Sequence, residues 1–183
     1  GDEVSAIAEQ FQKRGKPSAC FLHGNATEEN FKTRVGKYSY LHVATHGYIN
    51  ERNPQLSMLL FSQPRDSTTL EDGVLYGGET YNLDLNVDLL VLSSCESGIG
   101  KLMRGEGIMA MTRGFFYSGA TNIIFSLWKV YDRQTSDLMR EFYRNVLAGE
   151  TLSCSLRKAK LTMIADQRSA FPSKWSGFIL VGN

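Results

Sequence analysis

Hydrophobic residues recur with the period of an α-helix near the start of the chain and again through its second half. The first set has i, i+3, i+4, i+7 spacing and consists of Val4, Ile7, Ala8 and Phe11. Gly15 and Pro17 then end the predicted helix. A second, short helix carries Phe31 and Val35, after cap residues in the segment 25–28. Further helices are predicted at Gly105–Tyr117, Asp132–Leu147 and Thr151–Asp166.

Short apolar runs between these helices predict strands. Asp88–Ser93 is apolar without alternation, as is typical of a central strand buried on both faces, and Asn122–Leu127 has the same character. The remaining predicted strands are Ser18–Leu22, Tyr40–Ala44, Met58–Phe61 and, as an outer strand at the close, Trp175–Val181. Segment 47–84 is rich in Gly, Pro, Asn and Asp, and it is predicted to be a loop-rich excursion around the single strand at 58–61.

The alternation of strands with crossover helices predicts an α/β fold, a three-layer α/β/α sandwich around a mostly parallel central sheet. The 183 residues, 42% of them hydrophobic, suffice for one packed core, so we expect one domain over residues 1–183. Because the chain begins at Gly1 rather than Met, we expect this domain to be excised from a longer, multidomain protein.

Charge and cysteine content narrow the function classes. Twenty basic and nineteen acidic residues leave a net charge of +1, which gives no electrostatic reason to expect binding to nucleic acid or to a membrane surface. Cys20, Cys95 and Cys154 are widely spaced and form no zinc motif, so we expect no metal and a reducing, cytoplasmic location. The glycines near 105–107 lack the Lys-Ser/Thr of a phosphate loop, and no cofactor is predicted.

Two reactive side chains follow predicted strands. His46 comes after the strand Tyr40–Ala44, and Cys95 comes after Asp88–Ser93. Because the carboxyl ends of parallel strands meet at one edge of a sheet, we expect an imidazole and a thiol to emerge there together. A thiolate attacks carbonyls and an imidazole protonates the leaving group, as in a cysteine peptidase. The alternative is a buried cysteine and a core histidine, each with a packing role.

The motifs around these residues resemble those of the CHAT domain, in the order of that family. They are YLHVATHG (40–47), LLVLSSCESG (89–98), GEG (105–107), IFSLWKVYD (124–132), FY (142–143) and WSGF (175–178). The resemblance implies a caspase–haemoglobinase fold, peptide-bond hydrolysis of protein or peptide substrates at restricted sites, and flanking tetratricopeptide repeats or other regulatory modules. It also implies a His46–Cys95 dyad, with the backbone N–H groups of Gly47 and Cys95 as the oxyanion hole. The alternative is a catalytically latent CHAT domain that acts as a regulatory protein-interaction module.

Glu96, directly after the candidate nucleophile, is one predicted substrate-binding residue. A carboxylate there favours Arg or Lys at the residue before the scissile bond. The alternative for Glu96 is a solvent-facing carboxylate, or one paired with Arg104 or Arg113.

Ser126, Trp128 and Asp132 form the other predicted part of the substrate pocket, because they lie at or beyond the carboxyl end of the strand Asn122–Leu127. Asp132 is also a suitable helix N-cap, and Trp128 is equally suited to packing. His42 shares the strand parity of His46, and we interpret it as a core or buttressing histidine.

Overall fold

The computed structural model describes residues 1–50, 52–64, 69–93, 95–96, 106–128 and 130–182. The chain divides into two compact units. The helical unit consists of Gly1–Cys20 and Val130–Leu180, and the sheet unit consists of Phe21–Lys129 and Val181–Asn183.

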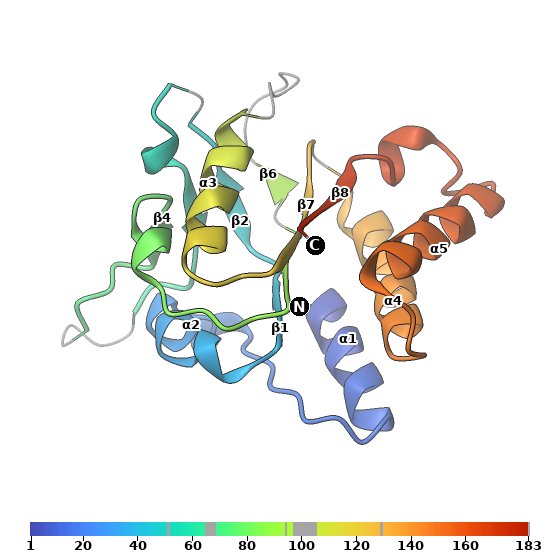
Figure 1. The fold of residues 1–183 in the computed structure, drawn as a ribbon, viewed down its shortest axis with the longest axis horizontal. Helices are drawn as coiled ribbons and strands as arrows, with labels where there is room; N and C mark the ends of the chain where they lie inside the picture. The colour runs from blue at the N-terminus through green and yellow to red at the C-terminus, as the bar shows by residue number, and fades with distance from the viewer. Residues whose placement is uncertain (51, 65–68, 94, 97–105, 129, 183) are drawn as a thin grey trace. The chain divides into compact units, whose positions relative to one another are not determined.

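A mostly parallel sheet, in which β5 pairs in parallel with both β1 and β7, forms the core of the sheet unit (Figure 1). Its strand order is β1-β5-β7-β8, and the bounds are β1 Tyr40–Val43, β5 Leu89–Leu92, β7 Asn122–Ser126 and β8 Phe178–Gly182. All four residues of β5 are buried, as are the first four of β7. The runs without polar alternation are therefore central strands, as predicted.

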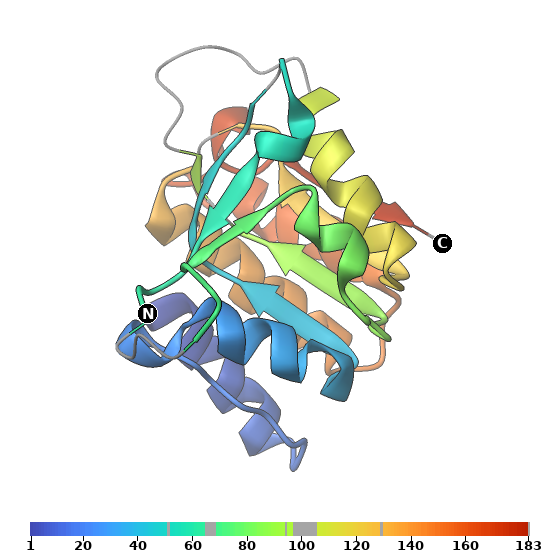
Figure 2. The same cartoon turned by 90° about the vertical axis from the view of Figure 1, so that its left-hand side faces the viewer.

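A second sheet carries the continuations of β1 and β5 (Figure 2). Its strand order is β4-β3-β2-β6, and the bounds are β2 His46–Tyr48, β3 Met58–Leu60, β4 Val74–Tyr76 and β6 Cys95–Glu96. β2 pairs with β3, and β3 with β4, in antiparallel fashion, whereas β2 and β6 are parallel. Segment 47–84 was expected to hold one strand, but it holds β3, β4 and most of β2.

Among the described residues of the sheet unit, two segments are α-helices. α2 spans Glu28–Arg34 and is capped by Thr27, whose side chain accepts a hydrogen bond from the Asn30 amide. α3 spans Glu106–Tyr117 and packs against a short 3₁₀ turn, η4. The 3₁₀ turns of the chain's described part are η1 His23–Asn25, η2 Val35–Lys37, η3 Pro54–Leu56, η4 Glu79–Asn82 and η5 Pro172–Lys174.

The helical unit packs α1, Asp2–Lys13, and α5, Leu152–Ala165, against α4, Asp132–Val146 (Figure 1). Tyr143 of α4 is 1% exposed and makes an edge-on ring contact with Phe11 of α1, at 5.7 Å between centroids. The Thr151 side chain caps α5. No helix within the described ranges is both long and apolar enough to span a membrane.

The fold class is confirmed as α/β with a mostly parallel central sheet and flanking helices, as in an α/β sandwich. Two of the predicted strands differ from the structure by more than a residue at one end. Segment 18–22 is no strand, because it has no ladder partner among the described residues. The last strand begins at Phe178 rather than at Trp175, because the Trp175 amide closes the turn η5 by donating to the Pro172 carbonyl.

Candidate active site

The His46 and Cys95 backbones lie on neighbouring parallel strands. In the first sheet Val43 of β1 is opposite Leu92 of β5, and in the second sheet His46 of β2 is opposite Cys95 of β6. The partners are 49 residues apart in both pairs. One register therefore continues across the break between the two sheets, and it brings the two predicted catalytic residues to adjacent positions.

His46 is exposed, and the next residue, Gly47, is buried. On the other side of β2, His46 is opposite Leu60 of β3, and the Thr45 hydroxyl donates a hydrogen bond to the Leu60 carbonyl. Gly47 is opposite the buried Leu59. Because successive strand residues face opposite sides of the sheet, His46 faces solvent and Gly47 faces the core.

The structure describes only the backbone of Cys95 and Glu96, in β6. Glu96 is the register partner of Gly47. Arg104 and the rest of the segment 97–105 lie outside the described residues. The nucleophile, the oxyanion hole and the substrate role of Glu96 stay predictions.

The other predicted pocket residues belong to two different units. In the sheet unit, the Ser126 hydroxyl donates to the Trp128 carbonyl at 2.7 Å, which closes the turn after β7. Asp132 belongs to the helical unit, where it is the exposed first residue of α4. The N-cap is Tyr131, so the cap alternative for Asp132 is wrong by one position. The Asp132 carboxylate still interacts favourably with the helix dipole, because it lies in the first turn of α4.

His42, on β1, contacts Ser93 at the end of β5. Its Nε2 lies 3.2 Å from the Ser93 hydroxyl oxygen. Ser93 is 7% exposed, and its amide also donates to the Val43 carbonyl at 3.0 Å. The buttressing interpretation of His42 thus has a specific partner, which sequence reasoning did not identify.

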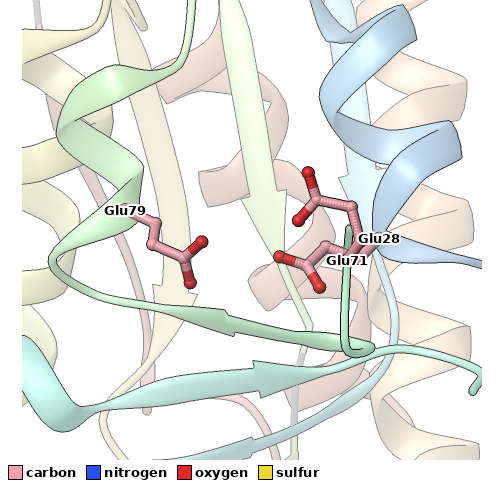
Figure 3. Close-up of side chains that lie close together, drawn as sticks. All are labelled: Glu28, Glu71 and Glu79. Atoms are coloured by element: carbon pink, nitrogen blue, oxygen red, sulfur yellow. The ribbon is translucent and has the colours of Figure 1, made fainter. Parts of the chain in front are cut away.

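Three carboxylates of the sheet unit converge between α2, the segment before β4 and the turn η4. They belong to Glu28, Glu71 and Glu79 (Figure 3). Such a group can hold a cation, but the ammonium of Lys32 is already there. Its Nζ lies 2.7 Å from Glu28 Oε1, 2.5 Å from Glu71 Oε2 and 2.8 Å from Glu79 Oε1. We name this group of four residues the Lys32 cluster.

The pKa values of Glu28 and Lys32 shift in the directions expected of a partly buried ion group. Burial raises the pKa of Glu28, and the hydrogen bond from Lys32 opposes that rise. Burial alone would lower the pKa of Lys32, but its bonds to the three carboxylates outweigh burial and raise it. The other oxygen of Glu28 accepts from the Gly73 amide, and that of Glu79 accepts from the Tyr76 amide. The Lys32 cluster therefore ties β4 to α2 and has a structural role.

Comparisons with known proteins agree with the motifs. The profile of a family described as CHAT domain matches residues 1–183. Tetratricopeptide repeat protein 28 of mouse is 31% identical over 118 residues, and that of human is 30% identical over the same length. These matches cover 64% of this chain and 5% of either relative, so the chain spans about one twentieth of the length of these relatives.

Proposed function

The chain belongs to the CHAT domain family, and from this premise we propose that it is a cysteine endopeptidase that uses Cys95 as nucleophile and His46 as general acid and base. The observation that carries the proposal is the register of β2 and β6, in which His46 is directly opposite Cys95. Residues opposite each other on neighbouring strands are about 5 Å apart at the backbone. An imidazole and a thiol come within hydrogen-bond reach from such positions.

The proposed reaction has two steps. The Cys95 thiolate adds to the scissile carbonyl carbon, and the negative charge moves to the carbonyl oxygen, where the N–H groups of Gly47 and Cys95 stabilise it. His46 gives a proton to the departing amine as the C–N bond breaks, which leaves a thioester. Water, deprotonated by His46, then attacks the thioester and releases the carboxylic acid and the thiol.

The test is a digest of a diverse peptide library by the purified chain, read by mass spectrometry. Cys95→Ala is expected to abolish cleavage. The matched controls are Cys20→Ala and Cys154→Ala, since both of these cysteines are free and exposed. Cleavage that persists in Cys95→Ala contradicts the proposal, and cleavage lost in all three variants points to instability rather than chemistry.

A second candidate function is supported by the relatives. Their name refers to tetratricopeptide repeats, and the chain matches a small part of each. The same domain can therefore serve as a latent regulatory module controlled by attached repeats. Activity that appears only when the chain is joined to its natural flanking sequence supports regulation of an enzyme. A cellular effect that is unchanged in the full-length Cys95→Ala protein supports a scaffold.

We also propose that the domain works in the cytoplasm on protein or peptide substrates. Free, exposed Cys20 and Cys154 suit a reducing compartment. Fractionation of cells that produce the full-length protein tests the location, and recovery in an oxidising compartment contradicts it.

A further inference from the structure

The parallel ladder that aligns His46 with Cys95 is interrupted immediately before them. β1 ends at Val43 and β2 begins at His46, while β5 ends at Leu92 and β6 begins at Cys95. The two breaks are of equal length, so the register is the same on both sides. The elements that bridge the interruption therefore decide whether the two reactive residues stay opposite each other.

A backbone and a side-chain hydrogen bond between described residues join the chain segments at this point. The Ser93 amide donates to the Val43 carbonyl at 3.0 Å, which extends the backbone ladder by one bond. The Ser93 hydroxyl oxygen then lies 3.2 Å from Nε2 of His42. His42 is opposite Val91, so Ser93 is its diagonal neighbour, two residues further along the adjacent strand. This side-chain bond spans the two segments, and we call it the His42–Ser93 clamp.

The His42–Ser93 clamp is close to the candidate dyad along both segments. Ser93 precedes Cys95 by two residues, and His42 precedes His46 by four. Two extended residues span at most about 7 Å, and four span about 13 Å. A shift at the clamp therefore reaches the thiol and the imidazole with little chain in between to absorb it.

The burial of Ser93 makes the bond costly to lose. Ser93 is 7% exposed, so its hydroxyl has little access to water. Removal of the His42 imidazole would leave this hydroxyl without a good hydrogen-bond partner. Neutral imidazole accepts a hydrogen bond at one ring nitrogen and donates at the other, so either tautomer of His42 can pair with a hydroxyl.

We infer that His42 is a positioning residue, which acts through Ser93 to hold Cys95 in register with His46. The inference rests on the proposed Cys95–His46 chemistry and adds a third residue to it. His42 touches neither substrate nor the reacting atoms in this proposal. It fixes the separation of the two strand segments that carry them.

The test measures the reactivity of the Cys95 thiol directly, so that it does not depend on peptidase activity. The 183-residue chain is prepared in a Cys20→Ser/Cys154→Ser background, because both of these thiols are exposed and would also react. The rate of Cys95 alkylation by iodoacetamide is followed from pH 5 to pH 9 by intact mass. His46→Asn in the same background defines the rate without an imidazole partner.

The His42→Phe variant is expected to lose about tenfold or more of the Cys95 alkylation rate at low pH and to approach the His46→Asn profile, since a displacement of about 1 Å is sufficient for losses of this order. His42→Gln places an amide nitrogen near the position of Nε2 and is expected to recover most of the rate. Ser93→Ala should resemble His42→Phe, and the double variant should be no slower than either, because both remove the same bond.

A matched control separates positioning from stability. The Ser62 hydroxyl also donates a long-range hydrogen bond in the sheet unit, to the His23 carbonyl, so Ser62→Ala is expected to lower the melting temperature without changing the alkylation profile. The inference is overturned if His42→Phe alkylates like the parent, if His42→Gln is as slow as His42→Phe, or if the parent profile is independent of His46. If the parent cleaves no peptide but its alkylation depends on both histidines, the proposed function fails and the positioning role stands.

Discussion

His46 and Cys95 are directly opposite each other on parallel strands, although neither strand exceeds three residues. So short a ladder has few backbone bonds of its own to hold the register. The longer β1–β5 pair behind it supplies the alignment, because it has the same 49-residue offset. The candidate dyad is thus an extension of the buried central sheet.

This arrangement predicts a large effect of the exposed histidine on catalysis and a small one on folding. His46→Asn is expected to lower kcat/KM for a cleaved peptide by about 10²- to 10⁴-fold, since the general acid and base is lost. The melting temperature should change little, because His46 is exposed. The matched control is His23→Asn, also at an exposed histidine of the sheet unit. A His46→Asn variant with parental kcat/KM contradicts the dyad.

Substitutions of Glu96 and Asp132, the two acidic candidates for the substrate pocket, are expected to have different effects. Glu96→Gln is expected to lower the preference for Arg over Leu before the scissile bond, measured as a ratio of kcat/KM values. Asp132→Asn is expected to cost about 0.3–1 kcal/mol of unfolding free energy, because Asp132 is in the first turn of α4. A change of peptide preference in Asp132→Asn, with unchanged stability, would instead assign the pocket to that residue.

The central strands and the candidate dyad could be predicted because their signals are local. Leu89–Leu92 is an unbroken apolar run, and such a run requires burial on both faces. His46 and Cys95 were identified by the motifs that follow two strands. Strands β2 and β4 were missed, because three residues are too few for a period-2 pattern and Gly47 weakens it further.

Interactions across long sequence separations could not be predicted in this way. Glu28–Lys32 has the i, i+4 spacing of a helical ion pair and is visible in the sequence. Glu71 and Glu79 join Lys32 from 39 and 47 residues away, and nothing local marks them as partners. Ser93 and His42 are likewise 51 residues apart. Only the fold brings these residues together.

The Lys32 cluster should be sensitive to loss of its cation. Lys32→Met leaves the carboxylate of Glu28, which is 1% exposed, without its counter-charge, and we expect a loss of about 3 kcal/mol or more in unfolding free energy. Lys13→Met is the control, because Lys13 and its partner Glu9 are largely exposed and such pairs contribute little. Urea unfolding of both variants measures the difference, and equal losses would refute the structural role of the cluster.

The Lys32 cluster also predicts that the stability of the folded protein falls at alkaline pH. The pKa of Lys32 is raised in the folded state above its ordinary value of 10.5. The contribution of Lys32 to the free energy of unfolding is therefore fully present below pH 10.5. It is lost as the pH rises from there through the folded-state pKa, by at most about 1.4 kcal/mol per pH unit. The stability difference between the parent and Lys32→Met should be constant from pH 8 to 10 and shrink above that. A difference that shrinks already between pH 8 and 10 contradicts the raised pKa.

The close packing of α3 on the turn η4 gives a last prediction, at Gly114. A Cβ at this position would lie 1.8 Å from the Thr80 hydroxyl oxygen, and Thr80 is fully buried. Alanine normally favours a helix by about 1 kcal/mol over glycine, but here the overlap forces α3 or η4 to move, so we expect a net destabilisation of about 1–3 kcal/mol.

The control for Gly114→Ala is Gly78→Ala, whose new Cβ would meet its nearest neighbour at an ordinary 3.8 Å. Thr80→Ala removes the colliding oxygen, which donates to the Gly77 carbonyl, and by itself costs that hydrogen bond. In the double variant Gly114→Ala/Thr80→Ala the two losses should be less than additive, because the worst overlap is gone and the nearest remaining atoms, Thr80 Cβ and Tyr81 Cδ2, lie 3.0 and 3.1 Å from the new Cβ. Thermal unfolding of the four proteins measures this coupling, and strict additivity would show that α3 does not approach η4 as closely as the structure places it.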